Sequence, residues 1–591
     1  MQILLQSQPA PTKKSKTIPQ ILHHHFFRRF FDNDTLTTEG ETETTVIRAL
    51  CAFATPCLMV TFWLAPHYPI RDLWDVATDR YIFVLYSFAT MAAVATFQWE
   101  MLFPDRSDFL ILLPLPLKPR QLFLAKARAL LTFLGMFLLA ANILSLFVFP
   151  AISTRKENSY FLAFYAHFSA VTLAGLFASA TMLAIAGIAI CLLPMNWFRR
   201  ISPVLQALSI TAILLVFLTF PLISTNLKPL LSADGTIGQY LPPLWFLGLY
   251  EQISLSPTAP AACAQLSQTA LIATGLALVA AILAYPLAWQ RQKKRALEGG
   301  HHSYAPTHNP ITTILEKTLL RLPQQRAAFH FLTQTITRYP RYQVYLAFYS
   351  GIGLALAIAA TLTLAESANH TVTLSISTIG LHAVQPLLLV WMVLGLKAAF
   401  AFPADMQSRW VFPINLPKTS PSAAPAANAG KTFVLLACLL LTALNILITL
   451  AQHWTYWALT IQAVIGVCLS LILANLFFLG RSGIPFTRPR LPGRTNLPIV
   501  FVLYTAVFPA IVLGTVQLEL HTEIHGELIY RILPTTAVLL LILKLADHLA
   551  KKGIIADLAE DEEPEGPQTL GLTRYSEPKR MIVILSEARR A

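Results

Sequence analysis

The chain has 591 residues, of which 55% are hydrophobic and only 13% are charged, and its mean hydropathy is +0.57. These values exclude a purely soluble globular protein and place the chain among membrane proteins. The formal net charge is +14, because 44 Lys and Arg residues outnumber 30 Asp and Glu residues. We interpret this excess as membrane topology and contact with anionic lipids, and we expect no nucleic-acid partner.

Apolar runs long enough to cross a bilayer recur along the whole chain. A membrane-spanning helix needs about 20 mostly apolar residues. Runs of this kind lie near 46–66, 81–103, 129–150, 161–193, 204–223 and 269–289, and again near 343–364, 382–402, 432–450, 457–479, 497–516 and 533–549. The sequence therefore predicts an all-α, polytopic transmembrane helical bundle of about 12 spans.

Positive charge alternates between the predicted loops. Lys and Arg precede the first span and then cluster in every second loop, which is the pattern of cytoplasmic loops. The intervening loops are balanced or acidic, such as the segment with Asp79 and Arg80 and the segment with Glu519 and Glu523, and we expect these to face outward. Both termini are then cytoplasmic, and a bacterial inner membrane is the expected location.

The predicted organisation has five parts. They are a cytoplasmic N-terminal segment (1–45), a first six-span domain (46–290), a cytoplasmic linker (291–342), a second six-span domain (343–550) and a cytoplasmic tail (551–591). The stretch from Ile18 to Phe31 is aromatic and basic, which favours a helix on the membrane surface. Its three histidines, His23 to His25, could also suggest a metal site, but the interfacial helix is the preferred interpretation.

No pattern of catalytic or metal-binding residues is present in the sequence. The six cysteines lack metal-ligand spacing, and no phosphate-binding loop or His-Glu-x-x-His motif occurs. His382 and His453 each stand alone near a predicted span end, which suggests an interfacial rather than a catalytic role. We therefore expect no metal, no catalytic residue and no enzymatic activity in this chain.

One loop recurs at equivalent places in the two predicted six-span sets. After the second span the chain reads Phe103-Pro-Asp-Arg-Ser-Asp108 and then Leu113-Pro-Leu-Pro-Leu-Lys-Pro119. After the eighth span it reads Phe402-Pro-Ala-Asp405 and then Phe412-Pro-Ile-Asn-Leu-Pro-Lys418. An even number of spans separates the two copies, so the halves are predicted to be parallel repeats.

These motifs resemble the membrane (permease) subunits of ATP-binding-cassette (ABC) transporters of the type-two exporter class. The stretch from Asp108 to Lys126 looks like the family's cytoplasmic coupling loop, which docks into the ATPase. Residues Leu241 to Tyr250, with Pro242, Pro243 and Trp245, resemble its short extracellular re-entrant element. The likeness covers the first half well, and the second half in span order and in the loop from Asp405 to Lys431.

The resemblance implies a mechanical role. Two separate ATP-binding-cassette ATPase subunits, which would hold ATP and Mg, would push on two coupling loops and move an unnamed substrate between the halves. The implied residues are Asp105, Asp108, Pro114, Pro116, Lys118 and Lys126 in loop 1, and Asp405, Pro413, Pro417, Lys418 and Lys431 in loop 2. The charged residues would contact the ATPase, and the prolines would hold the loop shape. The second half has no counterpart of the Pro242–Tyr250 element, so the halves are expected to differ.

A secondary transporter, a channel or a lipid scramblase working without ATP is the alternative. Transport coupled to a proton or sodium gradient usually requires carboxylates deep in the membrane, where each charge costs about 2.5–3.5 kcal/mol or more. The predicted spans contain none near their centres. This argues against proton coupling but leaves a neutral channel or scramblase open.

Overall fold

Long apolar helices form nearly all of the described chain. The computed structural model describes residues 17–31, 42–68, 71–99, 101–103, 106–154, 159–231, 237–255, 260–297, 315–317, 320–366, 372–400, 423–478, 485–486, 497–526 and 528–551. Within these residues, 11 helices are long and apolar enough to cross a membrane. A further long helix, Leu497–His525, lies where the eleventh span was predicted. The predicted fold class, an all-α polytopic bundle, is confirmed.

The elements follow the predicted order of two halves. The first half comprises α1 (Ile18–Arg29), α2 (Thr42–Leu64), η1 (Ala65–His67), α3 (Leu73–Phe97), α4 (Arg106–Leu112), α5 (Pro119–Ser153), α6 (Tyr160–Leu192), α7 (Met195–Leu218), α8 (Phe220–Thr225), α9 (Leu227–Leu230), η2 (Ile237–Tyr240), α10 (Pro242–Leu255) and α11 (Ala261–Leu297). The second half comprises α13 (Pro323–Arg338), α14 (Pro340–Thr361), β1 (Leu362–Glu366), β2 (Val372–Ile376), α15 (Thr378–Phe400), α17 (Ala423–Ala451), α18 (Tyr456–Phe477), α19 (Leu497–His525) and α20 (Leu528–Lys551). The predicted boundaries at 290 and 342 fall inside α11 and α14.

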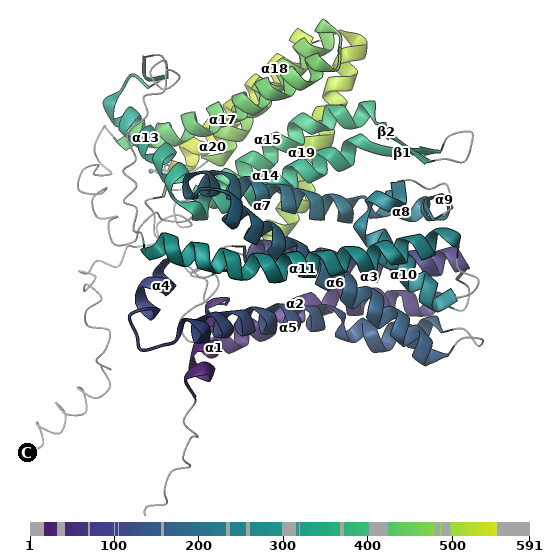
Figure 1. The fold of residues 1–591 in the computed structure, drawn as a ribbon. Coiled ribbons are helices and arrows are strands. Elements are labelled where there is room, and N and C mark those ends of the chain that lie inside the picture. The colour runs from purple at the N-terminus through teal and green to yellow at the C-terminus, as the bar shows by residue number, and fades with distance from the viewer. Residues whose placement is uncertain are drawn as a thin grey trace, which may run out of the picture.

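The bundle has two distinct ends, which Figure 1 shows at opposite sides of the view. The helices α1, α4 and α13 lie at one end, which we call the inner end because the sequence predicts it to be cytoplasmic. The short helices α8, α9 and α10 and the β1–β2 hairpin lie at the other, the outer end. The hairpin is antiparallel, with Leu364 opposite Leu374. Short elements thus gather at the ends, and long apolar helices run between them.

Proline begins several of the helices. It occupies the first position of α5, α13 and α14, where its missing N–H leaves no hydrogen bond unmade. The preceding residues Lys118, Leu322 and Tyr339 are extended, with ψ of 131°, 131° and 111°, because a following proline disfavours the helical conformation. The predicted loop before α5 therefore ends in an extended residue, Lys118, directly before the helix.

The two halves share most of their packing. The third span contacts the second and the fourth in both halves: α5 packs on α3 and α6, and α17 packs on α15 and α18. In addition, α1 packs on α5 and α13 packs on α17, so each half begins with a surface helix laid on its own third span. The predicted helix over Ile18–Phe31 is present as α1, and α13 is its counterpart.

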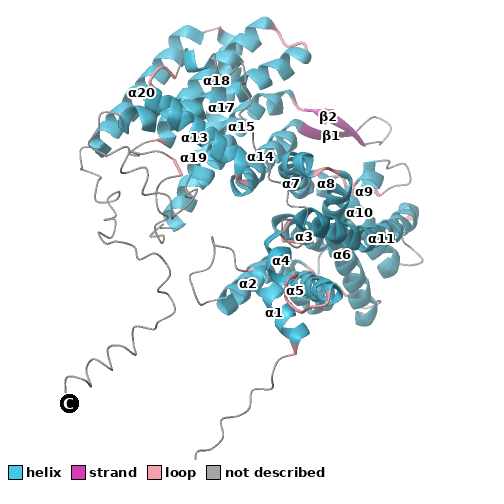
Figure 2. Ribbon diagram, turned by 60° about the vertical axis from the view of Figure 1, so that its left-hand side comes forward, coloured by secondary structure: helices cyan, strands magenta, loops and turns pink. Residues whose placement is uncertain are grey.

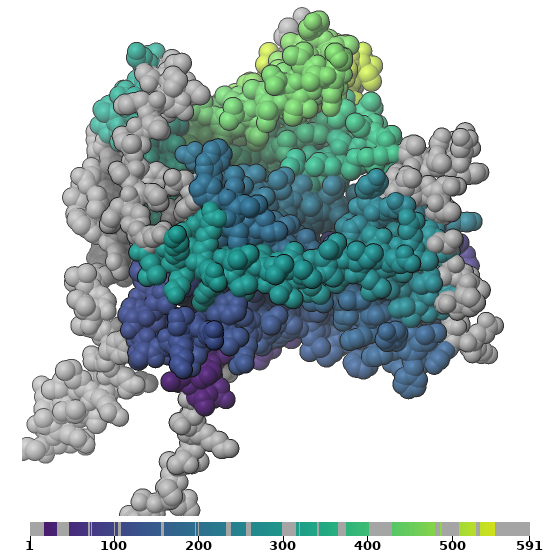
Figure 3. Space-filling model, in the orientation of Figure 1, coloured from purple at the N-terminus to yellow at the C-terminus, as the bar shows by residue number. Residues whose placement is uncertain are grey.

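The first spans of the halves sit differently. Helix α2 packs mainly on α5 of its own half, whereas α14 packs on α15 and on α7 of the first half. Figure 2 shows α7 and α14 side by side at the junction of the halves. In Figure 3 the first half fills the lower part of the view and the second half the upper part. The halves therefore meet chiefly through α7 and α14.

Two predicted outward loops are helical instead. Helix α3 begins at Leu73, so Asp79 and Arg80 lie inside it and are buried, and their assignment to a loop was wrong. Helix α19 continues past the predicted span end at 516 to His525 and carries Glu519 and Glu523. In both cases a charged residue inside the bundle has a partner on another helix, which hydropathy alone does not reveal.

Candidate functional site

The predicted coupling loop 1 presents an apolar tip at the inner end of the bundle. It consists of α4 and the turn from Leu113 to Lys118, which leads into α5. Ile111 is 68% exposed and Leu115 47% exposed. We call the exposed side chains of this loop the coupling surface; they are Leu110, Ile111, Pro114, Leu115, Pro116 and Lys118. An exposed apolar patch rimmed by a charged residue marks a site of contact with another protein or with the membrane.

Two residues of loop 1 that were predicted to contact an ATPase instead contact other residues of this chain. Asp108 is buried and forms an ion pair with Arg29 of α1. Lys126 is only 1% exposed, and its ammonium group lies 5.3 Å from the ring centre of Phe26 and 4.8 Å from that of Phe30. Both charges therefore fasten α1 to the loop and to α5. Asp105 lies outside the described residues.

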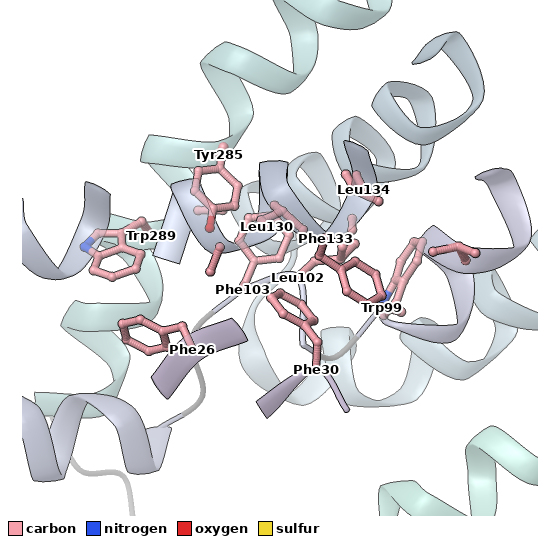
Figure 4. Packing of buried hydrophobic residues seen from close by; sticks show 14 of the residues in the cluster. Phe26, Phe30, Trp99, Leu102, Phe103, Leu130, Phe133, Leu134, Tyr285 and Trp289 are labelled. Atoms are coloured by element: carbon pink, nitrogen blue, oxygen red, sulfur yellow. The ribbon is translucent and has the colours of Figure 1, made fainter. Parts of the chain in front are cut away.

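Aromatic packing joins the loop to the last span of the first half. Phe109 of α4 and Phe123 of α5 each lie 5.3 Å from Trp289 of α11, measured between ring centres. Phe103, which precedes α4, lies 5.2 Å from Tyr285 of the same helix. Figure 4 shows the core around these contacts, where Phe26, Phe30, Phe103, Phe133, Tyr285 and Trp289 are packed together. Because such cores are close-packed, displacement of the loop would be transmitted to α1, α5 and α11.

Most of loop 2 lies outside the described residues, including Asp405, Pro413, Pro417 and Lys418. Lys431 lies in α17, and its ammonium group donates a hydrogen bond to Asn475 Oδ1 of α18. The neighbouring Thr432 accepts a hydrogen bond of 3.2 Å from Gln325 of α13. The third span of the second half is thus fastened to its surface helix at the same end as in the first half.

The predicted extracellular element is a buried helix at the outer end. Its Pro242 and Pro243 begin α10, and the indole of Trp245 donates a hydrogen bond of 2.8 Å to the carbonyl oxygen of Gln239. Tyr250 is fully buried, and the guanidinium carbon of Arg80 lies 4.8 Å above its ring. These contacts hold α10 against α3, α6 and α11.

A buried ion pair completes the attachment of α10. Arg80 Nη1 of α3 donates to Glu251 Oε2 at 2.7 Å, and both side chains are almost inaccessible. Burial raises the pKa of the Glu251 carboxyl, and the charge and hydrogen bond of Arg80 oppose this rise. Beside it, Arg71 lies 3.2 Å from Asp79. We did not predict these ion pairs from the sequence. A signal was present, because Glu251 directly follows the stretch Leu241 to Tyr250 and is the one acidic residue in α10.

The second half carries a buried polar group at its outer end. From the sequence we expected His382 to stand alone, and this was wrong. Its side chain is hydrogen-bonded to Glu519 of α19. The described residues contain no group of three or more His, Cys, Asp or Glu placed to hold a metal ion. The site residues therefore fall into three places: the coupling surface at the inner end, the Arg80–Glu251 pair, and the His382–Glu519 pair.

Comparison of this chain with protein-family models, with curated proteins and with solved structures finds no match. The chain is an integral membrane protein of helical architecture.

Proposed function

We propose that the chain is the membrane subunit of an ATP-driven exporter, with both six-span units in one polypeptide. The observation that carries the proposal is the coupling surface: an exposed Pro-Leu-Pro tip (114–116) at the inner end, packed through its loop against α1, α5 and α11. The recurrence of a surface helix on the third span of each half supports the same assignment. Substrate would move between the halves, and separate ATPase subunits would supply the energy.

The contacts divide the loop residues by role. Leu115 and Lys118, with the prolines between Leu113 and Lys118, would meet the ATPase because they are exposed. Asp108 and Lys126 would position the loop, since their charges are engaged within the chain. A push on the tip would then act through the Phe109–Trp289 contact on the sixth span. In the second half, Lys431 would stiffen the start of the ninth span in the same way.

The test is co-purification from native membranes in mild detergent, with the partner identified by mass spectrometry and its ATP hydrolysis measured. We expect a stoichiometric ABC ATPase with the wild-type chain. Leu115→Asn should reduce recovery of the ATPase at least about tenfold, because loss of one central apolar anchor costs about 2 kcal/mol or more. Leu374→Asn, on the exposed hairpin of the outer end, is the control and should have no effect. A chain that purifies alone and moves solutes in liposomes without ATP would overturn the proposal.

A transporter driven by an ion gradient is the second candidate function. It is favoured by the buried acids Asp79, Glu251 and Glu519, which the sequence had placed in loops or had not singled out. Buried ionisable residues within membrane bundles commonly mark ion or proton pathways. The same liposome assay separates the two, since only this candidate transports without an ATPase.

A further inference from the structure

The outer end of the second half contains a cluster of three titratable side chains. His382 Nδ1 of α15 lies 2.9 Å from Glu519 Oε1, and His382 Nε2 lies 3.8 Å from Glu523 Oε2, one helical turn further along α19. Both nitrogens of one imidazole thus face a carboxylate. Such an arrangement favours a second proton on the imidazole, because Nδ1–H then has a hydrogen-bond acceptor and the ring cation lies close to a second carboxylate.

The cluster is enclosed on its inner side and accessible on its outer side. The side chains of His382 and Glu519 are buried, whereas that of Glu523 is 37% exposed. The ring of Trp454, from the turn between α17 and α18, covers His382 with 4.8 Å between ring centres. One turn deeper, the buried amide of Gln385 has no hydrogen-bond partner among the described residues. Exchange with the outer solution would therefore pass by Glu523.

Charge balance indicates what this cluster binds. With one proton on the imidazole, which is then neutral, and both carboxylates ionised, the cluster has a net charge of −2, and a second proton on the ring reduces it to −1. Burial in a low-dielectric environment disfavours the net charge and so favours the second proton. A metal ion is not indicated, since these residues are not arranged as a ligand set.

Among the residues that the structure describes, few other titratable groups lie on the elements around the cluster. Helix α19 also carries His521 and His525, whose rings lie 4.2 Å apart. The turn after α17 contributes His453 and the start of α18 contributes Tyr456, and both are exposed. The outer half of α14 has no titratable residue. The first half has no described acid–histidine pair of this kind, so the feature belongs to one half.

We propose that His382, Glu519 and Glu523 form a proton-binding site that is open to the outer side of the membrane and links α15 to α19. Release of its protons leaves uncompensated carboxylates between these two spans and weakens their contact. The site is independent of the coupling surface and does not require that an ATPase drives the protein.

The stability of the purified full chain in detergent gives the first test. A site that holds protons more tightly in the folded chain than in the unfolded one stabilises the fold at low pH, and this contribution is lost as the pH rises. Loss of protons from this site should therefore lower the unfolding temperature of the wild type by about 1–2 °C between about pH 5.5 and pH 8. The fall should be absent in His382→Gln and unchanged in His453→Asn, a nearby exposed histidine.

Trp454 fluorescence gives a readout that does not depend on stability. A protonated imidazole quenches an adjacent indole, so the difference in emission between the wild type and Trp454→Phe should rise from about pH 5 to about pH 9. Glu523→Gln removes one negative charge from a partly exposed position and should move the midpoint to lower pH. A pH-independent Trp454 signal, or the same profile in wild type, His382→Gln and Glu523→Gln, would overturn the proposal.

Discussion

Arg80 and Glu251 lie 171 positions apart in the sequence and meet at 2.7 Å inside the bundle. Each would be costly to bury alone, because an unpaired charge loses its hydration without gaining a partner. Paired, they attach the short helix α10 to the second span. The ring of Tyr250 beneath the guanidinium adds a cation–π contact of about 1 kcal/mol. The pair therefore specifies where α10 sits more than it stabilises the chain overall.

Glu251→Gln should destabilise the protein strongly. Removing one partner of a buried ion pair leaves the other charge uncompensated, at a cost of about 3–5 kcal/mol. The double variant Arg80→Met with Glu251→Leu should recover most of this loss, since no charge remains buried. Thermal unfolding in detergent measures both. Asp75→Asn serves as control, because Asp75 is exposed and lies 3.9 Å from Arg71; an equal effect there would contradict the argument.

At the scale of elements, α1 and α13 have the same relation to their halves. Each is short and amphipathic and contacts a third span through phenylalanine: Phe30 stacks on Phe133 with 4.6 Å between ring centres, and Phe329 lies 5.7 Å from Phe433. Helices of this length are marginal alone in water. Tertiary packing therefore holds them, and in α1 that packing includes the Lys126 ammonium group.

Phe26→Ala should detach α1 while leaving the spans folded. Phe26 is 1% exposed, and truncation of a buried phenylalanine costs about 3–5 kcal/mol, comparable to the contact energy of so short a helix. Hydrogen–deuterium exchange over 18–29 should rise sharply, and ATPase coupling should fall. Ile21→Ala on the exposed face of α1 is the control. Unchanged protection of α1 in Phe26→Ala would show that other contacts hold it.

The whole molecule consists of two similar halves joined asymmetrically. The α7–α14 contact depends on a close approach at Gly351, where an added Cβ would lie 2.9 Å from the carbonyl oxygen of Ala207 and 3.1 Å from Ile210. The hydroxyl of Thr211 lies 3.2 Å from the carbonyl oxygen of Gly351. Such small-residue contacts are a common way for membrane helices to associate. Relative motion of the halves would therefore have to change this contact.

Gly351→Ala should loosen the junction of the halves and destabilise the chain by about 1–3 kcal/mol, because backbone atoms of α7 cannot move aside cheaply. Thermal unfolding gives the stability. Disulfide cross-linking between cysteines at positions 97 and 348, whose native rings lie 5.2 Å apart, reports the spacing of the halves and should slow. Gly275→Ala is the matched control, as nothing lies near its Cβ, and it should be neutral or slightly stabilising.

The sequence by itself determined the class of the protein, the order and approximate limits of its spans, the surface helix α1, and the position of the loop that became the coupling surface. These features are local, because hydropathy over about 20 residues and proline at a helix start depend on neighbours in the chain. The structure confirmed the all-α class and placed long apolar helices over 11 of the 12 predicted spans, with α19 over the remaining one. Loop 2 and the roles of both loops stay predictions.

Only the tertiary structure decided which charges face outward. Asp108 and Lys126 looked available to a partner but pair with α1, while Asp79, Arg80 and Glu519 looked like loop residues but are buried. Asp79 pairs with Arg71, just before its own helix, whereas the other four side chains have their partner on another helix, such as Glu251 for Arg80 and His382 for Glu519. A bilayer makes a lone buried charge costly and a paired one tolerable, and the partner comes from a distant segment that no local pattern identifies.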